Sequence, residues 1–183
     1  HFAAKRSIIV PAPNGYFLYC ITTMMIVKKI SAREGLFSML TNYHTHTTRC
    51  GHAEGTEEEY ILTALRCGYK VLGFSDHTPW AYATPGFVSH IRMLPAQLDD
   101  YVLTLRSLRE KYADRLHLHI GLEAEYFPAY LGWLKEETER LGIEYLILGC
   151  HYDTTDEQDA KARRFGGSAS PAHGRRYAEQ VER

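Results

Sequence analysis

The feature that most constrains the fold is an alternation of strand-like and helix-like segments that begins near residue 39. Strand patterns are expected at 40–46, 71–77, 116–123 and 145–149, and helix patterns at 56–67, 95–112 and 130–141. Strand, helix and strand repeated at this spacing form βαβ units, whose strands lie parallel because the crossover between them is right-handed. The sequence therefore predicts an α/β protein built on a parallel sheet.

Local signals mark the ends of the expected helices. Thr56 followed by Glu59 has the spacing of a capping box, and Gly68 can adopt the left-handed conformation that ends a helix. Pro95 suits the first turn of the second helix. Apolar residues then recur every three or four positions through that helix, at Leu98, Tyr101, Val102, Leu105, Leu108 and Tyr112. This is the clearest helical pattern in the chain.

Residues 1–38 show no sustained period of 3.6 or 2. Their most apolar run, 16–27, is about 12 residues long, short of the roughly 20 that a membrane helix needs. An export signal is the less favoured alternative, because Lys28 and Lys29 directly follow the apolar run and no cleavage motif appears. We expect residues 1–38 to be an upstream extension outside the domain, with Met39 as the natural start.

Composition excludes several classes of protein. The chain has 183 residues with 21 Lys and Arg against 22 Asp and Glu, a formal net charge of −1. It therefore lacks the basic surplus of a nucleic-acid binder and the composition of a disordered chain. Four cysteines without a C-x-x-C pair are too few for a disulfide scaffold. We expect one globular domain in a reducing compartment, the cytoplasm.

Potential metal ligands follow each of the four expected strands. They are His44 and His46 after the first strand, His77 after the second, Glu123 after the third and His151 after the fourth. Carboxyl ends of parallel strands meet at one edge of a sheet or barrel, so these side chains are expected to converge. The H-x-H spacing projects two imidazoles the same way from a strand, and His52 in the next loop can bend back toward them.

Each of these residues also has a structural interpretation. Alternating polar residues on a half-exposed strand often produce H-x-H, and His117 with His119 repeats that spacing at the start of its strand. We expect that second pair to lie away from the site, in structural or solvent-exposed roles. Asp76 could cap a turn or orient an imidazole. Cys50 and Cys150 adjoin expected ligands, and we favour buried packing over zinc binding for both.

Taken together, the motifs resemble a known family. Five motifs occur in order over roughly residues 40–152: H-x-H, a further His six residues on, Ser-Asp-His, Gly-Leu-Glu and Gly-Cys-His. This order resembles the PHP superfamily, named for polymerase and histidinol phosphatase domains. The loop ending in Arg92 and the string 121–128 are most similar to its histidinol-phosphate phosphatase branch. The resemblance implies a distorted (β/α)7 barrel, of which residues 39–183 are the N-terminal part with about the first four βα units.

The resemblance also implies a set of metal ligands. His44, His46 and Glu123 would hold one ion, Glu123 would bridge to a second ion held by His151, and His52 with His77 would serve a third. Two or three divalent ions are therefore expected, and histidine ligands favour zinc, iron or manganese over magnesium. The later histidine and Asp-x-His pair of the family do not follow in this sequence. We therefore expect a C-terminally truncated member with a less complete site.

The same resemblance assigns the remaining roles. Glu123 and His151 are the expected catalytic residues, Asp76 is expected to support an imidazole, and Arg92 is a candidate for binding phosphate through its planar guanidinium. A surface ion pair is the alternative for Arg92. Because the metal ligands that the family has nearer its C-terminus are absent from this sequence, we expect the 183-residue chain to bind metal weakly and to turn over substrate poorly.

The expected function is a metal-dependent phosphomonoesterase. Motifs for cysteine, aspartate, histidine and serine nucleophiles are missing, which leaves metal-activated water. The resemblance implies a histidinol-phosphatase, converting L-histidinol phosphate to L-histidinol and phosphate in histidine biosynthesis. The alternatives are a PHP-type phosphoesterase or exonuclease acting on nucleotides, or a non-catalytic remnant. The expected partner is a small phosphomonoester, with neither nucleic acid nor membrane.

Overall fold

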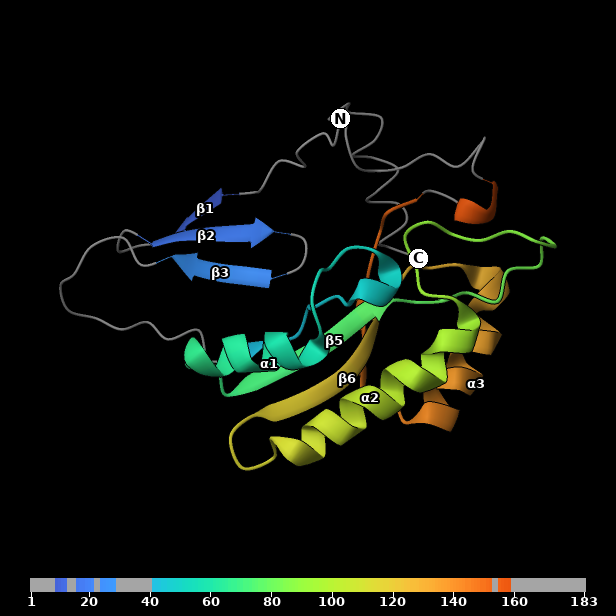
Figure 1. Cartoon of the computed structure of the whole chain (residues 1–183). Coiled ribbons are helices and arrows are strands. Elements are labelled where there is room, and N and C mark those ends of the chain that lie inside the picture. The colour runs from blue at the N-terminus through green and yellow to red at the C-terminus, as the bar shows by residue number, and fades with distance from the viewer. Residues whose placement is uncertain (1–8, 13–15, 22–23, 29–40, 153–154, 159–183) are drawn as a thin grey trace.

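The computed structural model describes residues 9–12, 16–21, 24–28, 41–152 and 155–158 (Figure 1). Its main sheet has four strands in the order β4-β5-β6-β7, which are β4 (Thr41–Asn42), β5 (Val71–His77), β6 (His117–Ala124) and β7 (Tyr145–Leu148). All three pairings are parallel. The strands follow one another as the first four of a (β/α) barrel do, so the predicted fold class is confirmed.

Helices connect the strands of this sheet. They are α1 (Glu57–Arg66), α2 (Leu98–Lys111) and α3 (Leu131–Leu141), with short 3-10 helices η1 (Thr48–Cys50), η2 (Pro95–Gln97), η3 (Pro128–Tyr130) and η4 (Asp156–Gln158). The predicted capping box is present, because Glu59 N donates to Thr56 Oγ1 and Thr56 N donates to a Glu59 carboxylate oxygen. The predicted helix-ending Gly68 has a φ of 83°, and Gly142, which follows α3, has a φ of 56°, so both are left-handed. No described helix has the length and apolar character to cross a membrane.

A second, antiparallel sheet lies in the N-terminal segment. It consists of β1 (Ile9–Ala12), β2 (Tyr16–Ile21) and β3 (Met24–Lys28), in that order. Periodicity missed these strands because apolar runs this short carry no alternation that separates strand from helix. That residues 1–38 lie outside the domain stays a prediction, and Met39 lies outside the described residues.

The hydrophobic core lies between the main sheet and its helices. The buried residues of α2 are Leu98, Tyr101, Val102 and Leu105, and α2 runs beside β6 (Figure 1). The sheet contributes every second residue, namely Leu72 and Phe74 from β5 and Leu118, Ile120 and Leu122 from β6. Because successive side chains of a strand point to opposite faces, the residues between these belong to the other face of the sheet.

That other face is filled by Tyr145 of β7. A Cβ on Gly121 of β6 would lie 2.5 Å from Cζ of Tyr145, and one on Gly73 of β5 would lie 2.3 Å from its hydroxyl. The hydroxyl lies 2.7 Å from the carbonyl oxygen of Tyr43 and 3.0 Å from that of Phe74. The tyrosine therefore reaches from β7 over two strands, β6 and β5, and it can do so only because their glycines leave room for its ring.

The first strand is shorter than expected. The prediction of a strand over 40–46 is wrong beyond Asn42, where β4 ends. The Asn42 side chain accepts from His44 N at 2.9 Å and donates to Thr45 Oγ1 at 3.1 Å, which turns the backbone out of the ladder. Ser75 N still donates to Thr45 O at 2.9 Å. His44 and His46 therefore follow the strand rather than lie on it.

Candidate metal centre

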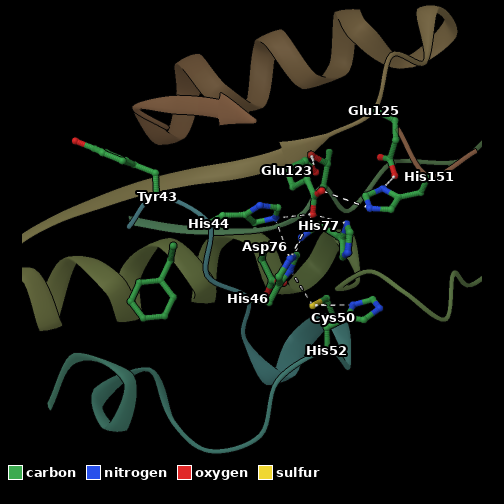
Figure 2. Close-up of polar contacts among 12 residues, drawn as sticks. Tyr43, His44, His46, Cys50, His52, Asp76, His77, Glu123, Glu125 and His151 are labelled. Carbon is green, nitrogen blue, oxygen red and sulfur yellow. Dashed lines mark hydrogen bonds and ion pairs between the residues drawn. The ribbon is translucent and has the colours of Figure 1, made fainter. Parts of the chain in front are cut away.

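Four histidines surround Glu123 at the carboxyl ends of the strands, and a fifth, His52, lies against His77 with ring centroids 4.8 Å apart (Figure 2). Glu123 is near the end of β6 and pairs in register with His77, the last residue of β5. His44 and His46 follow β4, His52 follows η1 and His151 follows β7. The structure brings together all six residues that the sequence placed at strand ends or in the loop after the first strand. This is the geometry expected when parallel units share one edge.

The Glu123 carboxylate is the centre of this group. Its Oε2 lies 3.1 Å from His44 Nε2, 3.3 Å from His46 Nε2 and 3.2 Å from His77 Nδ1. Its Oε1 lies 3.4 Å from His151 Nε2. Burial raises the pKa of Glu123, but the close contact with His44 and the electrostatic effect of His151 and His46 outweigh it, so the pKa falls below its usual range. Glu123 is therefore an anion in a buried site.

Asp76 holds one of these imidazoles. Its Oδ1 lies 3.4 Å from His46 Nδ1 and accepts from His77 N at 3.2 Å, while Thr47 Oγ1 donates to Oδ2. The carboxylate is fully buried. Asp76 thus offers an acceptor to Nδ1 of His46, which favours the tautomer whose Nε2 lone pair faces Glu123. The contact expected of Asp76 is thus present.

Glu125 holds a second imidazole in the same way. Its Oε1 lies 2.9 Å from His151 Nδ1. Burial raises the pKa of Glu125, but the hydrogen bond from His151 and the charge of Arg92 lower it to about 2. The residue was missed from the sequence. The sequence does carry a signal for Glu125. This residue stands two positions after Glu123, past the end of an apolar strand, where a charged side chain needs a partner.

The donor set fits a divalent cation. With Glu125 holding the His151 proton on Nδ1 at 2.9 Å, His151 Nε2 is an acceptor that faces an acceptor oxygen of Glu123 at 3.4 Å, and two acceptors do not bond to each other. Among the described residues, buried His77 Nδ1 and Glu123 Oε2 have no hydrogen-bond partner, and burial lowers the pKa of His77, which keeps it neutral. Ligands bound at about 2.0–2.1 Å stand roughly 3.0–3.4 Å apart, close to the separations here.

Three overlapping groups of side chains each place one potential ligand atom per residue within 4.8 Å of the others. They are His44, His46 and Glu123; His77, Glu125 and His151; and His46, Cys50 and His52. In the third group, Cys50 Sγ lies 3.6 Å from His46 Nδ1 and 3.4 Å from His52 Nδ1. Burial raises the pKa of the Cys50 thiol, which opposes a free thiolate. Cys150, half-buried, also has a raised pKa because of burial.

Arg92 is buried beside the histidine group. Nη1 and Nη2 donate to the two Glu125 oxygens at 2.7 and 2.6 Å, and Nε donates to Asp156 Oδ2 at 3.1 Å. The side chain is 1% exposed, so the surface ion pair considered as its alternative role is wrong. Binding a phosphate would require Arg92 to exchange one of these carboxylates. Its phosphate-binding role stays a prediction.

His117 and His119 lie at the amino end of β6, away from Glu123, as expected. His119 Nδ1 lies 2.6 Å from Glu144 Oε2, and its ring contacts Tyr43 with centroids 5.5 Å apart. Both partners of the ion pair are about one third exposed. This pair belongs to the surface.

Comparison with known proteins supports one family. The model of the PHP domain family matches residues 42–180. A Deinococcus radiodurans protein named probable histidinol-phosphatase is 34% identical over 116 residues, covering 62% of this chain and 42% of that protein. A Schizosaccharomyces pombe protein of the same name is 29% identical over 115 residues, covering 60% of this chain and 38% of that protein. The chain thus spans about two fifths of the length of these relatives.

A solved structure shares the fold. It is that of a Listeria monocytogenes protein provisionally assigned as a histidinol phosphatase, with a TM-score of 0.54 and 23% sequence identity. The match covers 70% of this chain and 50% of that one.

Proposed function

This chain belongs to the PHP domain family, and from that premise we propose that it is part of a metal-dependent phosphomonoesterase that hydrolyses L-histidinol phosphate to L-histidinol and phosphate. The observation that carries the proposal is the convergence of four histidines, with His52 beside them, on the buried carboxylate of Glu123. The names of both curated relatives support histidinol phosphate as the substrate. Histidine biosynthesis in the cytoplasm is the setting we propose.

The proposed ligand assignment follows the geometry. His44, His46 and Glu123 would hold one ion, Glu123 and His151 a second, and His52 with His77 a third. Imidazole and carboxylate ligands suit zinc, iron or manganese. Ions bound there would supply a water activated as hydroxide and would neutralise charge on the phosphoryl oxygens.

The side chains themselves contribute orientation and charge. Asp76 and Glu125 keep the protons of His46 and His151 on Nδ1, which directs both Nε2 lone pairs inward. The raised pKa of the buried Cys50 keeps it a thiol, so it does not supply a thiolate nucleophile. Water is then the nucleophile that this set of residues favours.

The test is phosphate release from L-histidinol phosphate by the 183-residue chain, with zinc or manganese and after chelation. We expect slow, metal-dependent release that Glu123→Gln removes. Release that is equally fast after chelation would overturn the metal mechanism. Faster hydrolysis of nucleotides than of histidinol phosphate would overturn the substrate assignment.

A further inference from the structure

Three charged side chains beside the proposed metal centre form a buried group, here named the Arg92 network: Arg92, Glu125 and Asp156. They come from the connection between β5 and α2, from the end of β6 and from η4. Their side chains are 1%, 0% and 4% exposed. Burying a charged side chain destabilises the fold unless each of its polar atoms has a partner. The contacts of these three side chains therefore indicate what the network does.

The carboxylates of this network have their oxygens engaged. Glu125 accepts both arms of the guanidinium, at 2.7 and 2.6 Å, and lies 3.4 Å from Trp80 Nε1. Asp156 accepts from Arg92 Nε at 3.1 Å, from Ser89 Oγ at 2.7 Å and from Tyr82 OH. A bidentate guanidinium permits one orientation of the carboxylate it binds. Asp156 therefore sets the position of the Arg92 guanidinium, and Arg92 sets the orientation of the Glu125 carboxylate.

The orientation of Glu125 decides what His151 does. The His151 side chain is 39% exposed, and its other described contacts are an edge-on approach to His77, with centroids 4.9 Å apart, and the facing Glu123 oxygen. Glu125 Oε1 at 2.9 Å holds the proton on Nδ1. Without that acceptor, the ring is free to rotate or to carry its proton on Nε2, the atom that faces Glu123.

We propose that Asp156 and Arg92 are positioning residues that act through Glu125 to keep His151 Nε2 unprotonated and directed at Glu123. This inference rests on the proposed function, in which His151 holds the second ion. It deepens that function by assigning Asp156, which lies 64 positions from Arg92 along the chain, to the assembly of the ion site at His151 and not the others. The His44–His46–Glu123 group makes no contact with Asp156 among the described contacts.

The experiment is a zinc titration of the 183-residue chain, read by competition with a chromophoric chelator. Asp156→Asn keeps the shape of the side chain and removes its charge. It should weaken one ion-binding step about 10-fold to 100-fold and leave the other steps unchanged, since loss of a residue that orients a metal ligand has effects of this size. Unchanged affinities for every ion would overturn the proposal.

The matched control is Asp99→Asn. Asp99 accepts both arms of Arg140, at 2.7 and 2.9 Å, but this pair is about half exposed and has no described contact with the histidines of the site. The control should bind zinc as the parent chain does. Equal weakening in both variants would also overturn the proposal, because it would reveal a general effect of charge.

Nitrogen-15 spectra of the metal-free chain give a second readout, the position of the proton on His151. The parent chain should show Nδ1–H, and Tyr82→Phe, which removes one hydroxyl donor to Asp156, should shift part of the population to Nε2–H. Tyr82→Phe provides the test of the network if the Asp156→Asn variant fails to fold. An unchanged proton position would overturn the inference. If the parent chain binds no zinc, the proposed function fails, and the spectra still test the network.

Discussion

The two ends of the main sheet each carry a histidine–glutamate pair, and the pairs differ in kind. At the amino end, His119 and Glu144 lie 2.6 Å apart, with 37% and 31% of their side chains exposed. At the carboxyl end, His77 and Glu123 lie 3.2 Å apart, and each side chain is 5% exposed. The shorter contact is thus the exposed one. Burial and the convergence of several strands distinguish the candidate site, whereas the contact distance of one pair does not.

The largest expected effect comes from Glu123→Gln, which removes the central anion of the carboxyl end without changing its shape. The charge that offsets the ions disappears, and a neutral amide faces four histidines. We expect metal affinity to fall at least about 100-fold. Glu144→Gln at the amino end is the matched control. Equal zinc binding by the two variants in equilibrium dialysis would remove the distinction between the two ends.

A smaller effect is expected from Gly149→Ala, just after β7. A Cβ there would lie 2.8 Å from His151 Cε1 and 2.9 Å from Glu123 Oε1, so both side chains must shift. We expect about a ten-fold loss of metal affinity with the fold retained. Gly132→Ala is the control, because its Cβ would meet nothing within 4 Å and alanine favours the helix. Titration of zinc into both variants checks this, and an unaffected Gly149→Ala would show that the site tolerates displacement.

The pH dependence of stability should report on the buried imidazole of His77. Burial lowers the pKa of His77, so the folded chain keeps it neutral while the unfolded chain binds a proton as pH falls below about 6.5. The unfolded state then holds more protons, so stability is highest above that pH and falls by up to about 1.4 kcal/mol per pH unit below it. Urea unfolding of the metal-free chain at pH 7 and 5 measures this loss. His77→Gln should reduce the loss, whereas a loss of the same size would contradict the assignment.

The smallest effect is expected from His119→Gln at the amino end. Exposed ion pairs contribute about 0–1 kcal/mol, so the free energy of unfolding should change by less than about 1 kcal/mol. Zinc affinity should stay that of the parent chain. A loss of zinc binding here would mean that the amino end takes part in the site.

Much of the fold could be predicted because its signals are local. The capping box at Thr56, the glycines after α1 and α3, and the repeated apolar positions of α2 each act within a few residues. The H-x-H strand was overextended because the side chain of Asn42 competes with the ladder for backbone groups, which strand patterning does not register. The strands of residues 9–28 were missed because each is only four to six residues long.

The sequence by itself determined which residues stand at the carboxyl ends of the parallel strands, because periodicity and helix ends place each strand and parallel units share one edge. Only the tertiary structure decided how those residues are held. The pairing of Arg92 with Glu125 and Asp156 joins positions 33 and 64 residues apart, and Tyr145 reaches a carbonyl group 71 residues away. Such contacts depend on how side chains pack between distant elements, and no local pattern carries that information.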